Sequence, residues 1–75
     1  MKIIEIDIGI FVNIDNVFKI ELVKLEKGAG YYWKFFSESE NNYAISKEFN
    51  DAEESKEWLS MQTLRASATK EIIEL

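Results

Sequence analysis

Residues 31–36, with the sequence YYWKFF, constrain the fold more than any other part of the chain because five of the six are aromatic. Aromatic residues are typical of β-strands, and successive side chains of a strand point to opposite faces. Both faces of this strand are therefore apolar, apart from Lys34. One face can supply a core, and the other face needs a second cover.

The chain has 75 residues, and we expect one domain that covers residues 1–75. A domain of this size buries only about 60% of the surface that its unfolded chain exposes. The sequence contains neither Cys nor His, which excludes disulfides and the usual zinc sites as sources of stability. Dense packing and oligomerisation are then the remaining sources of stability. We expect the protein to bind no metal and no cofactor.

The chain is acidic, with 14 Asp and Glu residues against 9 Lys and Arg residues and a net charge of −5. Affinity for nucleic acid comes largely from Lys and Arg, so this charge disfavours nucleic-acid binding. Carboxylates interrupt the apolar residues of segment 1–7, and no run of about 20 apolar residues occurs. These patterns argue against a signal peptide and a membrane span, and they predict a soluble cytoplasmic protein.

Four segments have the alternation or the composition of β-strands, and turn-forming residues separate them. Isoleucine alternates with other residues in the first segment, and Gly28 and Gly30 favour a tight hairpin before the aromatic strand. The predicted strands are residues 2–10, 17–26, 31–36 and 43–49, and the predicted turns are residues 12–17, 27–30 and 37–42. The sheet therefore spans about residues 2–49.

A helix is predicted from about residue 51. Asn50 is a typical N-cap, Glu53 can reach back to it, and acidic residues suit the positive end of the helix dipole. Trp58 and Leu59 offer an apolar stripe to the sheet. Residues 66–75 fit either more helix or a final strand, which would pair with an edge of its own sheet or of a neighbour's.

These elements predict an α+β fold, namely a four-stranded antiparallel meander with one C-terminal helix packed on one face. The expected core residues are Ile4, Ile6, Phe18, Ile20, Trp33, Ile45, Trp58 and Leu59.

No combination of residues predicts catalysis. Glu5 and Asp7 share a strand face, but alternating acids are the usual way to keep one face of a sheet in water. The serines have no His or Cys to activate them. Asn13 and Asp15 lie in a segment that lacks the Gly and Glu of a calcium loop, so they are better explained by turn formation.

The second face of the aromatic strand is the candidate interaction surface, formed by Tyr32, Lys34 and Phe36. A loop, the tail or another subunit would cover it. The alternative is a platform on which single-stranded nucleic acid stacks, as aromatic strands with nearby Lys residues provide.

Over about residues 10–60 the chain resembles small uncharacterised proteins of Gram-positive bacteria and their phages. The resemblance rests on the segment 13–17 (NIDNV), a glycine turn, an aromatic strand, and Phe49 followed by acidic residues and Trp58-Leu59. It implies a β-meander that ends in a helix, and it implies no activity.

The sequence therefore predicts a non-enzymatic protein-interaction module that self-associates as a dimer. Two alternatives remain open. One is an acidic phage- or plasmid-type inhibitor that binds a basic site on a host or defence protein, and the other is single-stranded nucleic-acid binding through the aromatic strand.

Overall fold

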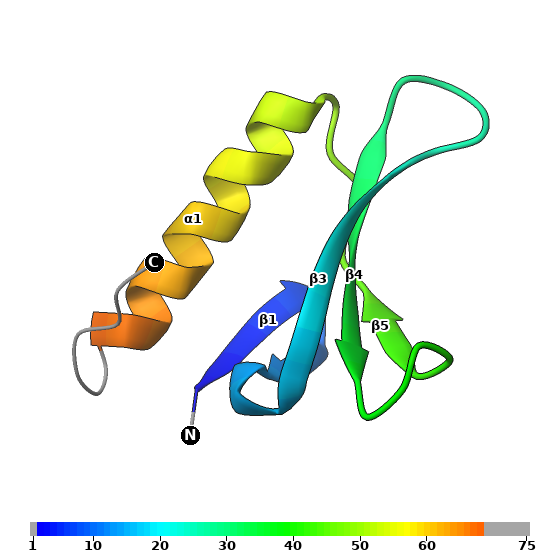
Figure 1. Cartoon of the computed structure of the whole chain (residues 1–75). Helices are drawn as coiled ribbons and strands as arrows, with labels where there is room; N and C mark the ends of the chain where they lie inside the picture. Colours follow the sequence, from blue (N-terminus) through cyan, green and yellow to red (C-terminus); the bar gives the residue numbers. More distant parts are fainter. Residues whose placement is uncertain (1, 69–75) are drawn as a thin grey trace.

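The computed structural model describes residues 2–68, with side chains as far as residue 62 (Figure 1). The elements are strands β1 (Ile3–Asp7) and β2 (Ile10–Asn13), a short 3-10 helix (Ile14–Asn16), strands β3 (Val17–Lys24), β4 (Tyr31–Ser37) and β5 (Tyr43–Ile45), and helix α1 (Ala52–Ala68).

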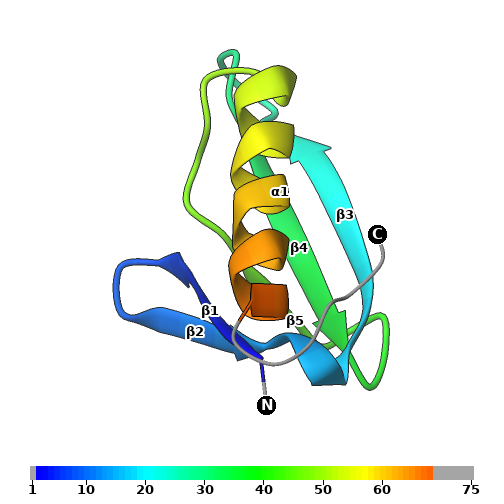
Figure 2. The same ribbon diagram turned by 90° about the vertical axis from the view of Figure 1, so that its left-hand side faces the viewer.

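The strands form two antiparallel sheets, a two-stranded sheet β1–β2 and a three-stranded sheet in the order β3–β4–β5. Helix α1 crosses one side of the three-stranded sheet and also contacts β1 (Figure 2). The predicted α+β fold with one helix and antiparallel strands is confirmed. The predicted single four-stranded meander is wrong, because the strands divide into two sheets. Of the predicted tail, residues 66–68 belong to α1, and residues 69–75 lie outside the described residues.

The segment predicted as one strand, 2–10, is in fact part of a β-hairpin. The chain reverses at Ile8 and Gly9, where Gly9 has a φ of 73° and the carboxylates of Asp7 and Glu5 accept the N–H groups of Ile8 and Gly9 at 2.8 and 3.0 Å. Alternating isoleucines continue through the turn, so the pattern hides the reversal. The second strand of this hairpin, β2, begins just before residues that were predicted as a turn.

We expect Gly9→Ala to destabilise the protein by about 1 kcal/mol, because an L-residue pays for a positive φ. In a domain of this size that loss lowers the midpoint of thermal unfolding by about 4–8 °C. Ile8→Ala in the same turn is the control, since the Ile8 side chain is 93% exposed and its loss should change little. Equal midpoints for the two variants would contradict the turn geometry.

The core lies between α1, β1 and the inner face of the three-stranded sheet. Its buried members are Ile4, Ile6, Trp33, Phe35 and Phe49, and Ile20, Trp58 and Leu59 pack against them with partial exposure. The Trp58 ring meets Phe35 edge-on at 6.4 Å, and the Trp33 indole N–H donates to the Ser55 carbonyl at 3.0 Å. These two contacts fix the helix on the sheet.

Two of the predicted core residues, Phe18 and Ile45, are exposed by 54% and 50%. A β-bulge between Val17 and Lys19 adds one residue to β3 and takes Phe18 out of the inner face. In β5, Ala44 lies opposite Phe35 and faces the core, so Ile45 points away from it.

The end of β5 joins the two sheets. Ser46 is buried, its N–H donates to the Trp33 carbonyl, and its hydroxyl accepts the Trp33 N–H, both at 2.9 Å. The Ser46 hydroxyl thus accepts a hydrogen bond that a backbone carbonyl would accept if β5 continued beside β4. The next N–H, of Lys47, donates to the Ile6 carbonyl of β1 at 2.8 Å.

The helix begins one residue later than the Asn50 cap predicts. Asp51 accepts the Glu54 N–H at 2.8 Å, and the Glu54 carboxylate accepts the Asn50 N–H at 2.9 Å. Asp51 is therefore the N-cap, and Glu54 reaches back to the N–H of Asn50, one residue before the N–H that a capping box uses. Asn50 contributes its backbone to the cap, and the predicted partner Glu53 has no part in these two bonds.

Candidate interaction surface on the three-stranded sheet

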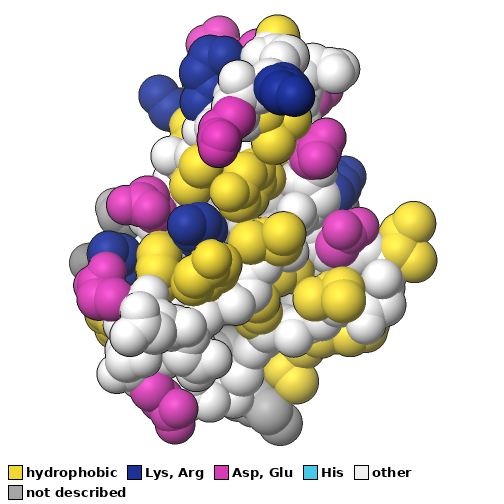
Figure 3. Space-filling view, turned by 90° about the vertical axis from the view of Figure 1, so that its right-hand side faces the viewer, with side chains coloured by type: hydrophobic (Ala, Val, Ile, Leu, Met, Phe, Trp, Pro, Cys, Tyr) yellow, Lys and Arg dark blue, Asp and Glu magenta, His cyan; other side chains and the backbone are white. Residues whose placement is uncertain are grey.

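The face of β3–β4–β5 that points away from α1 holds the residues predicted as an interaction surface, and we call it the outer face. Apolar side chains gather on it among charged ones (Figure 3). The strand registers and the ring contacts of Phe18 place its members: Phe18, Lys19, Glu21 and Val23 from β3, Tyr32, Lys34 and Phe36 from β4, and Tyr43 and Ile45 from β5.

Phe36 is the centre of a cluster on this face. Its ring lies 6.3 Å from the ring of Phe18 and 5.3 Å from that of Tyr43, and the Lys19 ammonium lies 4.4 Å from its centroid. Phe36 is consequently only 4% exposed. The expectation that Phe36 presents its ring to a partner is wrong, since the chain's own side chains cover it.

The other two predicted members of the surface, Tyr32 and Lys34, are half-buried. Lys34 places its ammonium 4.5 Å from the centroid of the Tyr43 ring. Tyr32 lies opposite Val23 on the neighbouring strand. The structure therefore brings the predicted residues to one face, but their neighbours supply most of its exposed apolar area.

Sequence reasoning missed Phe18, Tyr43 and Ile45 as surface residues, and they are 54%, 46% and 50% exposed. For β5, Ala44 was a usable signal, because a small residue fits opposite the buried ring of Phe35. For Phe18 no signal was available, because the residues around a bulge do not differ from those of a regular strand.

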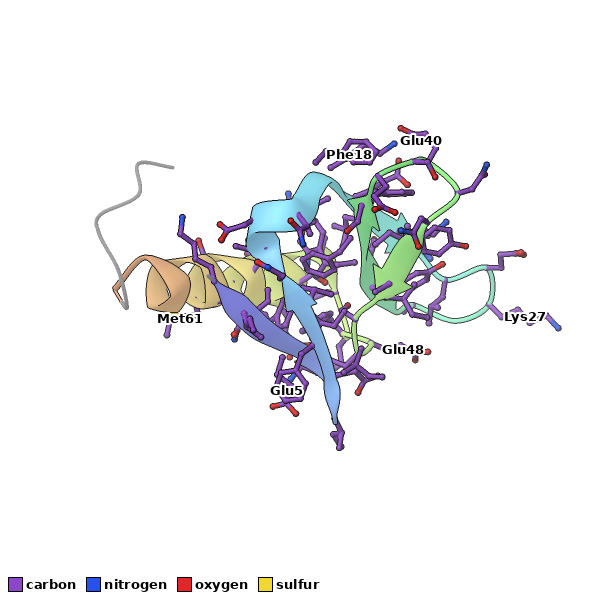
Figure 4. All side chains as sticks on the ribbon, turned by 90° about the horizontal axis from the view of Figure 1, so that it is seen from below. Glu5, Phe18, Lys27, Glu40, Glu48 and Met61 are labelled. Carbon is purple, nitrogen blue, oxygen red and sulfur yellow. The ribbon has the colours of Figure 1, made fainter. Side chains whose placement is uncertain are left out.

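A charge pair borders the outer face near the first residues of β3. The Lys19 ammonium donates to the Glu40 carboxylate at 2.7 Å, and this hydrogen bond raises the pKa of Lys19 above its ordinary value. Phe18 and Glu40 lie near each other at this end of the sheet, whereas Glu5 belongs to the distant hairpin (Figure 4). The pair is exposed and contributes little to stability.

The carboxylates beside one hollow of the described chain have structural roles. This hollow of about 270 Å³ between the hairpin and the helix is lined by Glu5, Asp7, Lys47 and Trp58, among others. Both carboxylates already accept turn N–H groups, which explains their presence structurally. Likewise, the Asn13 side chain accepts the Asp15 N–H at 3.0 Å, as expected for a turn.

Within residues 2–68, no three His, Cys, Asp or Glu side chains come together as a metal site. The described part of the chain also contains no helix with the length and apolar character needed to cross a bilayer. The similarity to small Gram-positive and phage proteins stays a prediction. No known protein family, curated protein or solved structure matches the chain.

Proposed function

We propose that this chain is a non-enzymatic, cytoplasmic protein-interaction module that self-associates as a dimer through the sheet β3–β4–β5. The observation that carries the proposal is the outer face, where Phe18, Tyr43 and Ile45 are each about half exposed around the buried ring of Phe36. No described segment covers this face. Exposed apolar side chains that gather among charged ones are typical of interaction surfaces.

The charge of this sheet favours a second copy of the chain as the occupant. Lys19 and Lys34 stand among Glu21 and Glu40, so both signs are present in a chain with a net charge of −5. Two such chains repel each other over most of their surfaces. A region of balanced charge is where a second copy can approach at the lowest electrostatic cost.

The two alternatives have less support. Lysine ammoniums already lie against the rings of Phe36 and Tyr43, which leaves less ring surface on which a base can stack. Exposed carboxylates on the first turns of α1, such as Glu53 and Glu57, fit an acidic inhibitor of a basic site. Acidic residues at a helix start are also explained by the helix dipole, so they favour this function only weakly.

Sedimentation equilibrium over the micromolar range tests the proposal. We expect a mass that rises from one chain to two chains with concentration. Phe18→Ser should weaken the association about tenfold or more, because it removes a half-exposed ring from the sheet. Phe11→Ser is the matched control, since this ring is 60% exposed but belongs to the hairpin. A mass of one chain at every concentration contradicts self-association.

A further inference from the structure

The two edges of the three-stranded sheet differ. Strand β5 has only three residues, and just beyond it the Lys47 N–H bonds the Ile6 carbonyl of β1. Strand β3 has eight residues and, among the described elements, pairs with β4 alone. An unpaired strand of this length is a template for another strand.

The hydrogen-bonding direction of β3 follows from its hairpin. Leu25 donates to the Gly30 carbonyl at 2.9 Å, and bonded residues alternate along an antiparallel strand. Lys19, Glu21 and Val23 thus bond towards β4, whereas Ile20 and Leu22 direct their N–H and C=O groups to the free edge. The side chains of Ile20 and Leu22 are also only half-buried on the inner face.

The charged residues of β3 would lie opposite residues of the other sign in a second copy of β3 that runs antiparallel to the first. Lys19 and Glu21 lie two residues apart on the outer face, with Ile20 between them on the inner face. If a second β3 runs antiparallel with Ile20 opposite Ile20, each Lys19, whose ammonium also bonds Glu40 of its own chain, stands directly across from a Glu21 of the other copy. Opposite charges directly across a strand pair stabilise it.

We propose that two copies join edge to edge at β3, antiparallel about a twofold axis at Ile20, and form one continuous six-stranded sheet. This inference rests on the proposed self-association and specifies its geometry. Because Leu22 lies across from Phe18 in this register, the β-bulge between Val17 and Lys19 limits the regular seam to residues 19–21 of each copy. The seam adds main-chain hydrogen bonds that a contact between outer faces lacks.

Stacking of two outer faces, the contact that Phe18→Ser probes, is the competing geometry. The face carries Lys34 near its centre, and two copies stacked about a twofold axis would bring these like charges towards each other.

Charge exchange tests the seam. Lys19→Glu and Glu21→Lys each place like charges across both symmetry-related positions, so each variant alone should dimerise about tenfold more weakly than the unchanged chain. An equimolar mixture restores opposite charges at both positions and should recover dimers of near-original affinity. A folding defect cannot produce this recovery, and circular dichroism checks that each variant is folded.

Lys47→Glu is the matched control, because it makes the same charge change just beyond β5, at the other edge of the sheet. The seam predicts unchanged dimerisation for this variant. If the mixture fails to recover dimers and Lys34→Glu, near the centre of the outer face, weakens them more than Lys19→Glu does, the outer faces stack and the seam is wrong, while self-association stands. If the unchanged chain is a monomer throughout, both proposals fail.

Amide exchange gives an independent readout on the unchanged protein. The N–H group of Ile20 points away from β4, so it should exchange rapidly in dilute monomer and slow down as dimers form. The N–H of Glu21 is bonded within the sheet, so it should be protected from exchange at low and at high protein concentration. Equal exchange of Ile20 in monomer and dimer overturns the seam.

Discussion

Phe35→Ala is expected to remove most of the stability of this protein. The Phe35 side chain is 1% exposed and lies in the core beside Trp58. Truncating a buried Phe typically costs about 3–5 kcal/mol, through lost transfer energy and the cavity left behind. The total stability of a small domain is only about 5–15 kcal/mol, so a large part of the molecules should unfold at moderate temperature.

Urea denaturation followed by circular dichroism measures this loss. Phe18→Ala is the matched control, because it truncates the same type of ring on the other face of the sheet, where the side chain is 54% exposed. The control should lose clearly less stability than Phe35→Ala. Similar losses in the two variants would mean that the core is not on the helix side of β4.

Ser46→Ala should produce the second-largest effect, a destabilisation of about 1–3 kcal/mol. The Ser46 hydroxyl accepts the Trp33 N–H at 2.9 Å and donates to the Lys47 carbonyl at 2.8 Å. Without the hydroxyl, a buried N–H of the central strand has no acceptor. The loss of stability comes from the buried N–H that no longer has an acceptor. The cavity contributes little, because only one oxygen atom is removed.

Ser55→Ala provides the control for this prediction. Ser55 is fully buried, and its hydroxyl donates to the Asp51 carbonyl, which also accepts the Ser55 N–H. Removing this hydroxyl leaves no donor without a partner, and Ala has the higher helix propensity. Its denaturation midpoint should stay close to that of the unchanged chain. A larger loss for Ser55→Ala than for Ser46→Ala would contradict this account of the two hydroxyls.

The sequence predicted the helix and the β3–β4 hairpin well because their signals are local. Asp51 and Glu54 cap the helix next to the predicted cap residue Asn50, and glycines mark the hairpin turn. The division into two sheets was missed because Ile8 continues the alternation through a turn held by Glu5 and Asp7. Neither carboxylate reveals in sequence that it binds the backbone.

The candidate surface was predicted in position but not in exposure. Alternation correctly placed Phe36 on the face opposite Trp33 and Phe35, but it could not show that Phe18 turns over it. That contact depends on the bulge, which is a feature of the pairing between β3 and β4. Exposure on a small sheet thus depends on register as well as on alternation.

The hydrogen bond from Trp33 to Ser55 and the ring contact between Phe35 and Trp58 also have a consequence for synthesis of the chain. The paired strands are neighbours in sequence, so each hairpin can form as soon as its second strand leaves the ribosome. The cover for Trp33 and Phe35 comes from a helix that is translated later. A nascent chain that ends before Trp58 therefore carries an assembled sheet with its core side open, and this is the stage at which it most needs protection from aggregation.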